Sequence, residues 1–167
     1  GLEPLEQEAR EWADDWTKLS FEYKMKFKRR RPWEVKKEHD IDFVVNKSDT
    51  TESPSYPSGH AMMGYGVAEF YKDTYPLMSD EWDNIADIIA HSRLQMGVHY
   101  PSDVEASKKI VAQVSSSTKQ ANMASDAFNK VKSAINKDVL KTYRKSKTPL
   151  AHLKKVKKFL GNEALEA

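Results

Sequence analysis

The chain has 167 residues, contains no cysteine and carries a formal net charge of +2 at pH 7. This length predicts a single domain, residues 1–167, that can bury a hydrophobic core of its own. The lack of cysteine excludes disulfides, thiolate nucleophiles and cysteine-based zinc sites, and the nearly balanced charge favours no class of partner.

The first predicted element is an amphipathic helix. An apolar stripe repeats every three or four residues from Trp12 to Phe27, which is the spacing of one helix face. We expect the helix to end near Arg31, because a residue before proline is pushed out of the α region. Residues 33–57 show little periodicity and are expected to form a long loop, and loops of this length in compact domains are usually functional or disordered.

Three further helices are expected before residue 119. The second runs from about Ser58 to Pro76 and is expected to turn three side chains inward: Met63, Val67 and Phe70. The third runs from about Ser79 to Met96, with one apolar stripe: Trp82, Ile85, Ala86 and Ile89. A fourth starts at Pro101, which suits the first turn of a helix.

The run Ser115 to Thr118 either breaks or only weakens the fourth helix. Helical spacing resumes after it, so residues of about 119–167 are expected to form a C-terminal helical extension. No alternation typical of a strand persists anywhere in the chain. The sequence therefore predicts an all-α, compact helical bundle.

Arg93 lies on the apolar stripe of the third helix, where a hydrophobic residue is expected. A buried cation is costly unless an anion partners it. Two interpretations stay open: a salt bridge to an aspartate or glutamate, or an anionic ligand. Lys24 and Arg31 add two cations near the end of the first helix, although a basic run of this kind is usually a solvated surface.

Two short segments carry groups suited to acid–base and nucleophilic chemistry. In Pro57-Ser58-Gly59-His60, glycine allows a close backbone approach, and the following helix start offers free N–H groups to an anion. The alternative is an ordinary helix cap with a surface histidine. His99 and Asp103 are four residues apart, so the carboxylate can fix one imidazole nitrogen and leave the other basic. The alternative is an ordinary hydrogen bond at a helix start.

Together these segments resemble the three motifs of the type-2 phosphatidic acid phosphatase superfamily. This group includes bacterial class A acid phosphatases, membrane lipid phosphatases and vanadium-dependent haloperoxidases. The matching segments, which span residues 24–103, are Lys24 with six residues to Arg31-Pro32, then Pro57-Ser58-Gly59-His60, then Ser92-Arg93 with five residues to His99 and three more to Asp103.

The resemblance implies a catalytic core of about 12–114, with the active site at helix ends and loops. It also implies a role for each matching residue. His99 is the expected nucleophile, Asp103 orients it, and His60 acts first as general acid and then as general base. The remaining residues are expected to hold the phosphate oxygens: Lys24, Arg31, Ser58, Gly59 and Arg93. The implied enzyme is a metal-independent phosphatase that hydrolyses a soluble phosphomonoester or diphosphate through a phosphohistidine. No cofactor is expected, although vanadate or phosphate could occupy the site.

Two other functions remain open at this stage. A vanadate-dependent haloperoxidase would use the same anion site, and a non-enzymatic protein would use the basic residues to bind anions or nucleic acid. We expect a small phosphorylated substrate as the partner, with nucleic acid only in the form of a nucleotide. Three aromatic residues in or near the long loop are candidates for the leaving-group pocket: Trp33, Phe43 and Tyr56.

The compartment and the oligomeric state stay open. No apolar run approaches the roughly 18 residues of a membrane span, and no signal-peptide pattern opens the chain. We therefore expect a soluble protein of the cytoplasm or the periplasm. Gly1 at the first position is compatible with a processed start. The C-terminal helices could pack within the chain or across a homodimer.

Overall fold

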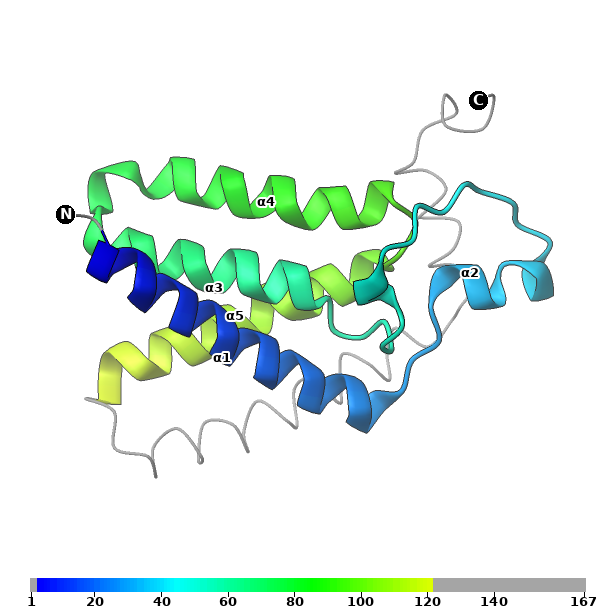
Figure 1. Cartoon of the computed structure of the whole chain (residues 1–167), viewed down its shortest axis with the longest axis horizontal. Coiled ribbons are helices and arrows are strands. Elements are labelled where there is room, and N and C mark those ends of the chain that lie inside the picture. Colours follow the sequence, from blue (N-terminus) through cyan, green and yellow to red (C-terminus); the bar gives the residue numbers. More distant parts are fainter. Residues whose placement is uncertain (1–2, 122–167) are drawn as a thin grey trace.

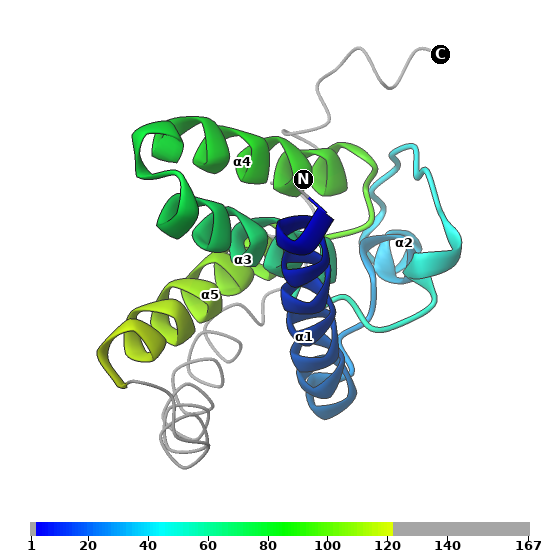
Figure 2. The same cartoon turned by 60° about the vertical axis from the view of Figure 1, so that its left-hand side comes forward.

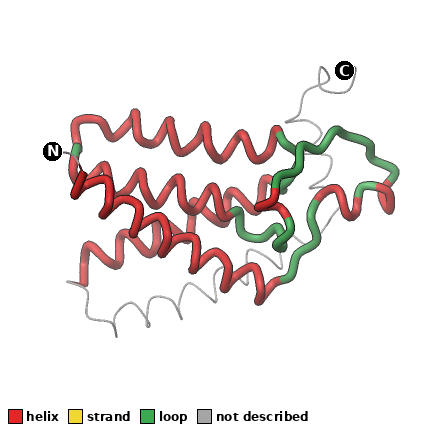
Figure 3. Tube along the Cα trace, viewed as in Figure 1, coloured by secondary structure: helices red, strands yellow, loops and turns green. Residues whose placement is uncertain are grey.

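The computed structural model describes residues 3–121, and every regular element in that range is a helix (Figure 3). This confirms the all-α prediction. Four long helices pack together (Figure 1): α1 (Glu3–Phe27), α3 (Gly59–Thr74), α4 (Ser79–Gln95) and α5 (Pro101–Ala121). Within the described residues, no helix has the length and apolar character needed to cross a membrane. The predicted extension, about 119–167, lies almost entirely outside them and stays a prediction.

Helix α3 is the centre of the bundle. It packs against α1, α4 and α5, and turning the molecule shows it enclosed by the other three (Figure 2). Its buried side chains differ from the expected inward stripe and are Ala61, Met62, Tyr65 and Ala68. The side chains expected to face inward are only half-buried: Met63, Val67 and Phe70. A helix with three neighbours buries more than one face, so the apolar spacing in the sequence predicted the wrong inward side chains.

Glycine allows α1 to approach α3 closely. Trp12 Nε1 donates a hydrogen bond to the carbonyl oxygen of Gly66 at 2.8 Å, and the buried Trp16 lies directly over the same residue. A Cβ atom at Gly66 would overlap the indole ring of Trp16. The two tryptophans meet edge to face, with ring centroids 5.9 Å apart. The long first helix is therefore fixed to the core by its tryptophans.

The first helix ends four residues earlier than expected. Lys28 has a left-handed φ of 47°, and its N–H donates to the carbonyl oxygen of Lys24 at 2.8 Å. Arg31 is extended, as a residue before proline should be, but the helix has already ended at Phe27. The expected loop contains three short helical turns: α2 (Pro32–Val35), η1 (Lys37–His39) and η2 (Asp49–Thr51).

The last two long helices correct two details of the sequence reading. On α4, Ile85 is 46% exposed, whereas Ala86 is fully buried and Arg93 remains on the buried side. A short 3-10 helix, η3 (Pro76–Met78), joins α3 to α4. Helix α5 continues through Ser115 to Thr118, so the polar run does not break it.

Two matched glycine substitutions in α3 test the close approach of α1. We expect Gly66→Ala to lower the free energy of unfolding by about 1–3 kcal/mol, because the new methyl group overpacks against Trp16. Gly64→Ala is the control: its Cβ would meet only the side chain of the half-buried Ile89, at 3.3 Å or more. The control should change stability by less than about 1 kcal/mol, with alanine's helix preference helping it. Equal urea unfolding curves for the two variants would contradict this packing.

Candidate active site

The three motifs meet where four helix ends converge. The carboxyl ends of α1 and α4 and the amino ends of α3 and α5 lie at the same side of the bundle (Figure 1). A cavity of about 860 Å³ opens there, and its wall includes five of the predicted site residues: Lys24, Arg31, Gly59, His60 and His99. Within residues 3–121, no three acidic or histidine side chains are grouped to hold a metal ion.

Three cations are buried at this junction. The exposed fractions are 4% for Lys24, 3% for Arg31 and 7% for Arg93. Among residues 3–121, no carboxylate oxygen lies within 4.0 Å of any of these three side chains. The salt-bridge interpretation of Arg93 is therefore wrong for the described part of the chain.

Neutral groups contact the cations instead. Arg31 donates from Nε to the carbonyl oxygen of Ser53 and from Nη1 to that of Val98, both at 2.8 Å. Lys24 Nζ donates to the carbonyl oxygen of Pro54. Arg93 donates from Nη1 to a methionine sulfur at 3.0 Å, and its buried Nε has no acceptor within the described residues. Buried charges held only by dipoles favour a bound anion strongly.

The buried cations also lower one another's pKa values. Burial, followed by the positive charge of Arg31, lowers the pKa of Lys24 to about 7. Burial likewise lowers the pKa of Arg31 to about 10, although Asp103 opposes the effect. An anion placed among these groups would reverse both shifts, because it stabilises the charged form of each.

The start of α3 adds backbone donors to the same cavity. Ser58 Oγ accepts a hydrogen bond from the Ala61 N–H at 3.4 Å and so caps the helix. Gly59 and His60 follow in the first turn, where N–H groups have no acceptor within the helix. Both residues line the cavity. The helix-cap interpretation is therefore confirmed, and the position of Gly59 and His60 at the cavity is compatible with anion binding, which stays a prediction.

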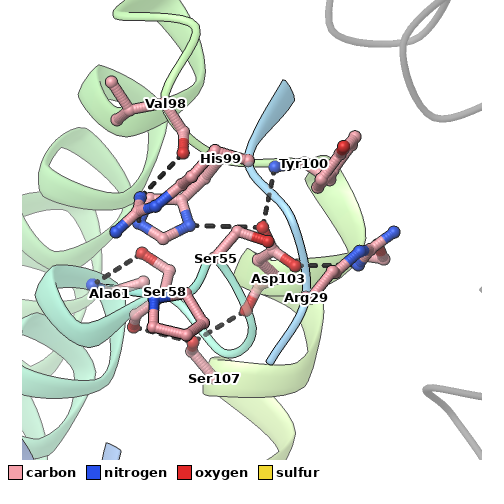
Figure 4. A network of polar contacts seen from close by, with 12 residues as sticks. Arg29, Ser55, Ser58, Ala61, Val98, His99, Tyr100, Asp103 and Ser107 are labelled. Atoms are coloured by element: carbon pink, nitrogen blue, oxygen red, sulfur yellow. Dashed lines mark hydrogen bonds and ion pairs between the residues drawn. The ribbon is translucent and has the colours of Figure 1, made fainter. Parts of the chain in front are cut away.

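His99 is held in one tautomer by groups on both sides of its ring (Figure 4). Its Nδ1 lies 3.2 Å from Asp103 Oδ2, and Arg31 Nη1 lies 2.9 Å from its Nε2. A guanidinium can only donate, so Nε2 carries the lone pair and Nδ1 carries the proton. Burial lowers the pKa of His99 to about 3 against the opposing effect of Asp103. The imidazole is therefore neutral, with its basic nitrogen on the side of Arg31.

Asp103 is fully buried and uses both carboxylate oxygens. Oδ2 accepts from the Tyr100 N–H at 2.9 Å as well as from His99, while Oδ1 accepts from Arg29 Nη1 at 2.8 Å. Burial alone would raise the pKa of Asp103, but Arg29 and these hydrogen bonds lower it below its ordinary value. Sequence reasoning did not find Arg29, because nothing distinguishes it within its basic run.

His60 faces the same cavity from α3 and is half-buried. Its pKa lies below the ordinary 6.5, first because of burial and then because of the positive charges of Arg93, Lys24 and Arg31. These three cations therefore disfavour a proton on His60. A bound phosphate offsets their charge, so we expect binding to raise the pKa of His60.

Two of the three predicted aromatic residues do not reach the cavity. Phe43 is 2% exposed and packs with Val35 and Tyr100 in a second hydrophobic cluster, and Tyr56 is fully buried in the main core. The prediction is wrong for these two residues. Trp33 lies against Arg31, whose Cζ is 5.5 Å from the centre of the indole ring, and lines a neighbouring cavity of about 550 Å³ to which Arg31 also contributes. Its place in the leaving-group pocket stays a prediction.

Three other apolar side chains line the cavity: Phe21, Met25 and Met63. Phe21 is 52% exposed and Met25 is 50% exposed, although both are large apolar residues. A sequence signal exists for Phe21, because it lies three residues before Lys24 on the same helix and so shares its face once Lys24 is assigned to the site. Met25 directly follows Lys24, and helical spacing from Lys24 does not predict its place at the cavity.

Comparison with protein families identifies one matching family model. The family model described as PAP2 superfamily matches residues 17–112. This range is more than half of the chain and contains all three motifs and every residue that lines the cavity. The comparisons with curated proteins and with solved structures gave no match.

Sulfate binding tests the anion site without any assumption about reaction chemistry. Sulfate stays doubly charged near neutral pH, so its affinity reports the protonation of the protein. We expect affinity to fall as the pH rises through about 7, because Lys24 loses its charge there. Lys24→Met should weaken binding about tenfold or more, since a hydrogen bond to a charged group contributes about 1.5–3 kcal/mol. It should also flatten the pH dependence near 7. Calorimetry that shows equal affinity for both proteins would contradict the assignment of Lys24.

Proposed function

The chain belongs to the PAP2 superfamily, whose members are typically phosphatases, and we propose that it hydrolyses a phosphomonoester or a diphosphate without a metal ion. The observation that carries the proposal is the set of three buried cations, without a carboxylate partner in residues 3–121, around a neutral histidine. Fixed cations can neutralise a transferring phosphoryl group as metal ions do in other enzymes.

Substrate binding prepares the nucleophile. The phosphate enters among Lys24, Arg31 and Arg93, with the N–H groups at the start of α3 as further donors. Arg31 Nη1, now 2.9 Å from His99 Nε2, shifts its hydrogen bond to a phosphate oxygen. The lone pair on Nε2 is then free to face phosphorus. Before the substrate binds, the hydrogen bond from Arg31 covers His99 Nε2, the nucleophilic atom. After the substrate binds, Nε2 is exposed to phosphorus. The two states differ by that single hydrogen bond.

The first chemical step transfers the phosphoryl group to His99. Nε2 forms a bond to phosphorus as the bond from phosphorus to the leaving oxygen breaks, and the electron pair of that bond stays with the oxygen. His60 donates a proton to this oxygen. The phosphorylated imidazole retains its proton on Nδ1 and gains positive charge, which Asp103 Oδ2 stabilises from 3.2 Å.

The second step returns the enzyme to its starting state. His60, now neutral, takes a proton from water as the water oxygen attacks phosphorus, and the bond from phosphorus to His99 Nε2 breaks. Phosphate leaves with the new oxygen.

The apolar side chains beside the phosphate site, Phe21, Met25 and Met63, favour a leaving group with an apolar or aromatic face.

Release of nitrophenol from p-nitrophenyl phosphate in EDTA tests the proposed activity. We expect the wild-type protein to remain active in EDTA and His99→Ala to fall to background. Arg93→Met should lower kcat about 10²–10³-fold, because it removes a preorganised donor to the transition state. His91→Ala is the matched control: this exposed histidine lies on α4, outside the cavity, and its loss should leave the rate unchanged. Activity abolished by EDTA, or retained in His99→Ala, would contradict the proposal.

The pH dependence of kcat/KM follows from the free enzyme. His60 must be protonated to act as the acid, and its pKa lies below 6.5, so the rate constant should be greatest in acid and decline as the pH rises through that pKa. The loss of charge on Lys24 near pH 7 should steepen the decline. His99 is deprotonated above about pH 3, so its protonation limits the rate only in strong acid. A value of kcat/KM that increased steadily toward alkaline pH would contradict these roles.

A further inference from the structure

Arg29 does not line the cavity that contains His99, yet it contacts the catalytic carboxylate directly. Its Nη1 donates to Asp103 Oδ1 at 2.8 Å and to the Ser102 hydroxyl at 2.8 Å. The side chain of Arg29 is 10% exposed, and that of Asp103 is not exposed at all. This ion pair therefore lies behind the nucleophile, on the side away from the substrate.

Several contacts hold the Arg29 guanidinium in place. It lies 4.1 Å from the centre of the Tyr100 ring and 5.8 Å from that of the Tyr56 ring, both of which are buried. Its backbone carbonyl oxygen accepts a hydrogen bond from the Ser55 N–H at 2.9 Å. Stacking on aromatic rings and a planar set of donors suit arginine and not lysine.

The two oxygens of the Asp103 carboxylate have different partners (Figure 4). Oδ1 binds Arg29, whereas Oδ2 accepts from the Tyr100 N–H and faces His99 Nδ1. Rotation of the carboxylate would break these hydrogen bonds together. Oδ2 is therefore kept against the imidazole, and the imidazole is kept in the tautomer that leaves Nε2 basic.

We propose that Arg29 is a positioning residue for the nucleophile, an assignment that rests on the proposed function. It holds the Asp103 carboxylate in one orientation and offsets part of its negative charge. Asp103 can then orient His99 and stabilise the phosphorylated imidazole without causing the resting ring to take up a second proton.

The charges around His99 determine the direction in which its pKa changes when Arg29 is removed. Asp103 on α5 favours a proton on His99, while Lys24 on α1 and Arg31 oppose it. His60 on α3 lines the cavity, and Arg93 on α4 is close enough for its charge to act on His60. Arg29 lowers the pKa of Asp103 and is the cation that faces the carboxylate from behind. Without it, the negative charge of Asp103 acts on His99 with less opposition, so the pKa of His99 rises.

A neighbouring arginine provides a matched control. Arg30 forms its ion pair with Glu38 at 2.7 Å, and both side chains are 53% exposed. Arg30→Gln removes the same charge from the same segment without touching Asp103. An effect of Arg29→Gln that Arg30→Gln does not share therefore comes from the contact with the carboxylate and not from the general loss of positive charge.

Nitrogen NMR of labelled histidine measures the effect directly and needs no turnover. In the wild type and in Arg30→Gln we expect His99 to be neutral at mildly acidic pH, with the proton on Nδ1. In Arg29→Gln the protonated fraction of His99 at the same pH should rise about tenfold or more, as expected for an unshielded neighbouring charge. Arg29→Lys should restore the charge but not the stacking, and so give an intermediate fraction. If Arg29→Gln does not fold, Arg29→Lys decides the question by the same comparison with wild type.

Kinetics give the second readout. Relative to Arg30→Gln, Arg29→Gln should move the acidic limb of the pH profile of kcat/KM to higher pH and lower kcat by about tenfold to a hundredfold. Unchanged protonation and tautomer of His99 in the folded Arg29 variants would overturn the proposal. An inactive wild type would instead contradict the proposed function, and the NMR result would still decide the role of Arg29.

Discussion

The site depends on positive charge that is buried without a carboxylate to neutralise it. Lys24, Arg31 and Arg93 are nearly inaccessible, and in the described part of the chain their hydrogen-bond partners are backbone carbonyls, an imidazole nitrogen and a sulfur. The ring of Trp33 lies against Arg31 as well. Such an arrangement opposes folding, because each charge loses its hydration. It persists because helix ends and the segment around Ser53 and Pro54 hold the cations in place. The site is thus already complementary to an anion, as electrostatic preorganisation requires.

The same charge explains the state of both histidines. His99 is neutral because it is buried among cations, and the one carboxylate that would favour its protonation is shared with Arg29. The protonated form of His60 is disfavoured until a phosphate binds. In the proposed mechanism, substrate binding therefore has two effects through one electrostatic change. It draws Arg31 away from the lone pair of His99, and it restores the proton that His60 needs as a general acid.

Much of this could be predicted from the sequence, for identifiable reasons. Periodicity located the four long helices, and an arginine on an apolar stripe marked Arg93 as exceptional. Local pattern failed where tertiary contacts decide. The inward face of α3 depends on three neighbouring helices, and Phe43 became core because the loop folds back onto the bundle. Arg29 could not be separated from its basic run, since its partner lies 74 positions away in the chain.

Detection of the phosphoenzyme tests the central claim most directly. In His60→Gln, nitrophenolate can leave without a proton from the enzyme, while hydrolysis of the intermediate lacks its base. The account predicts that an alkaline quench of this variant with p-nitrophenyl phosphate, followed by mass spectrometry, finds one phosphoryl group on His99. A burst of nitrophenolate with no phosphoenzyme, or with the phosphoryl group on another residue, would contradict it.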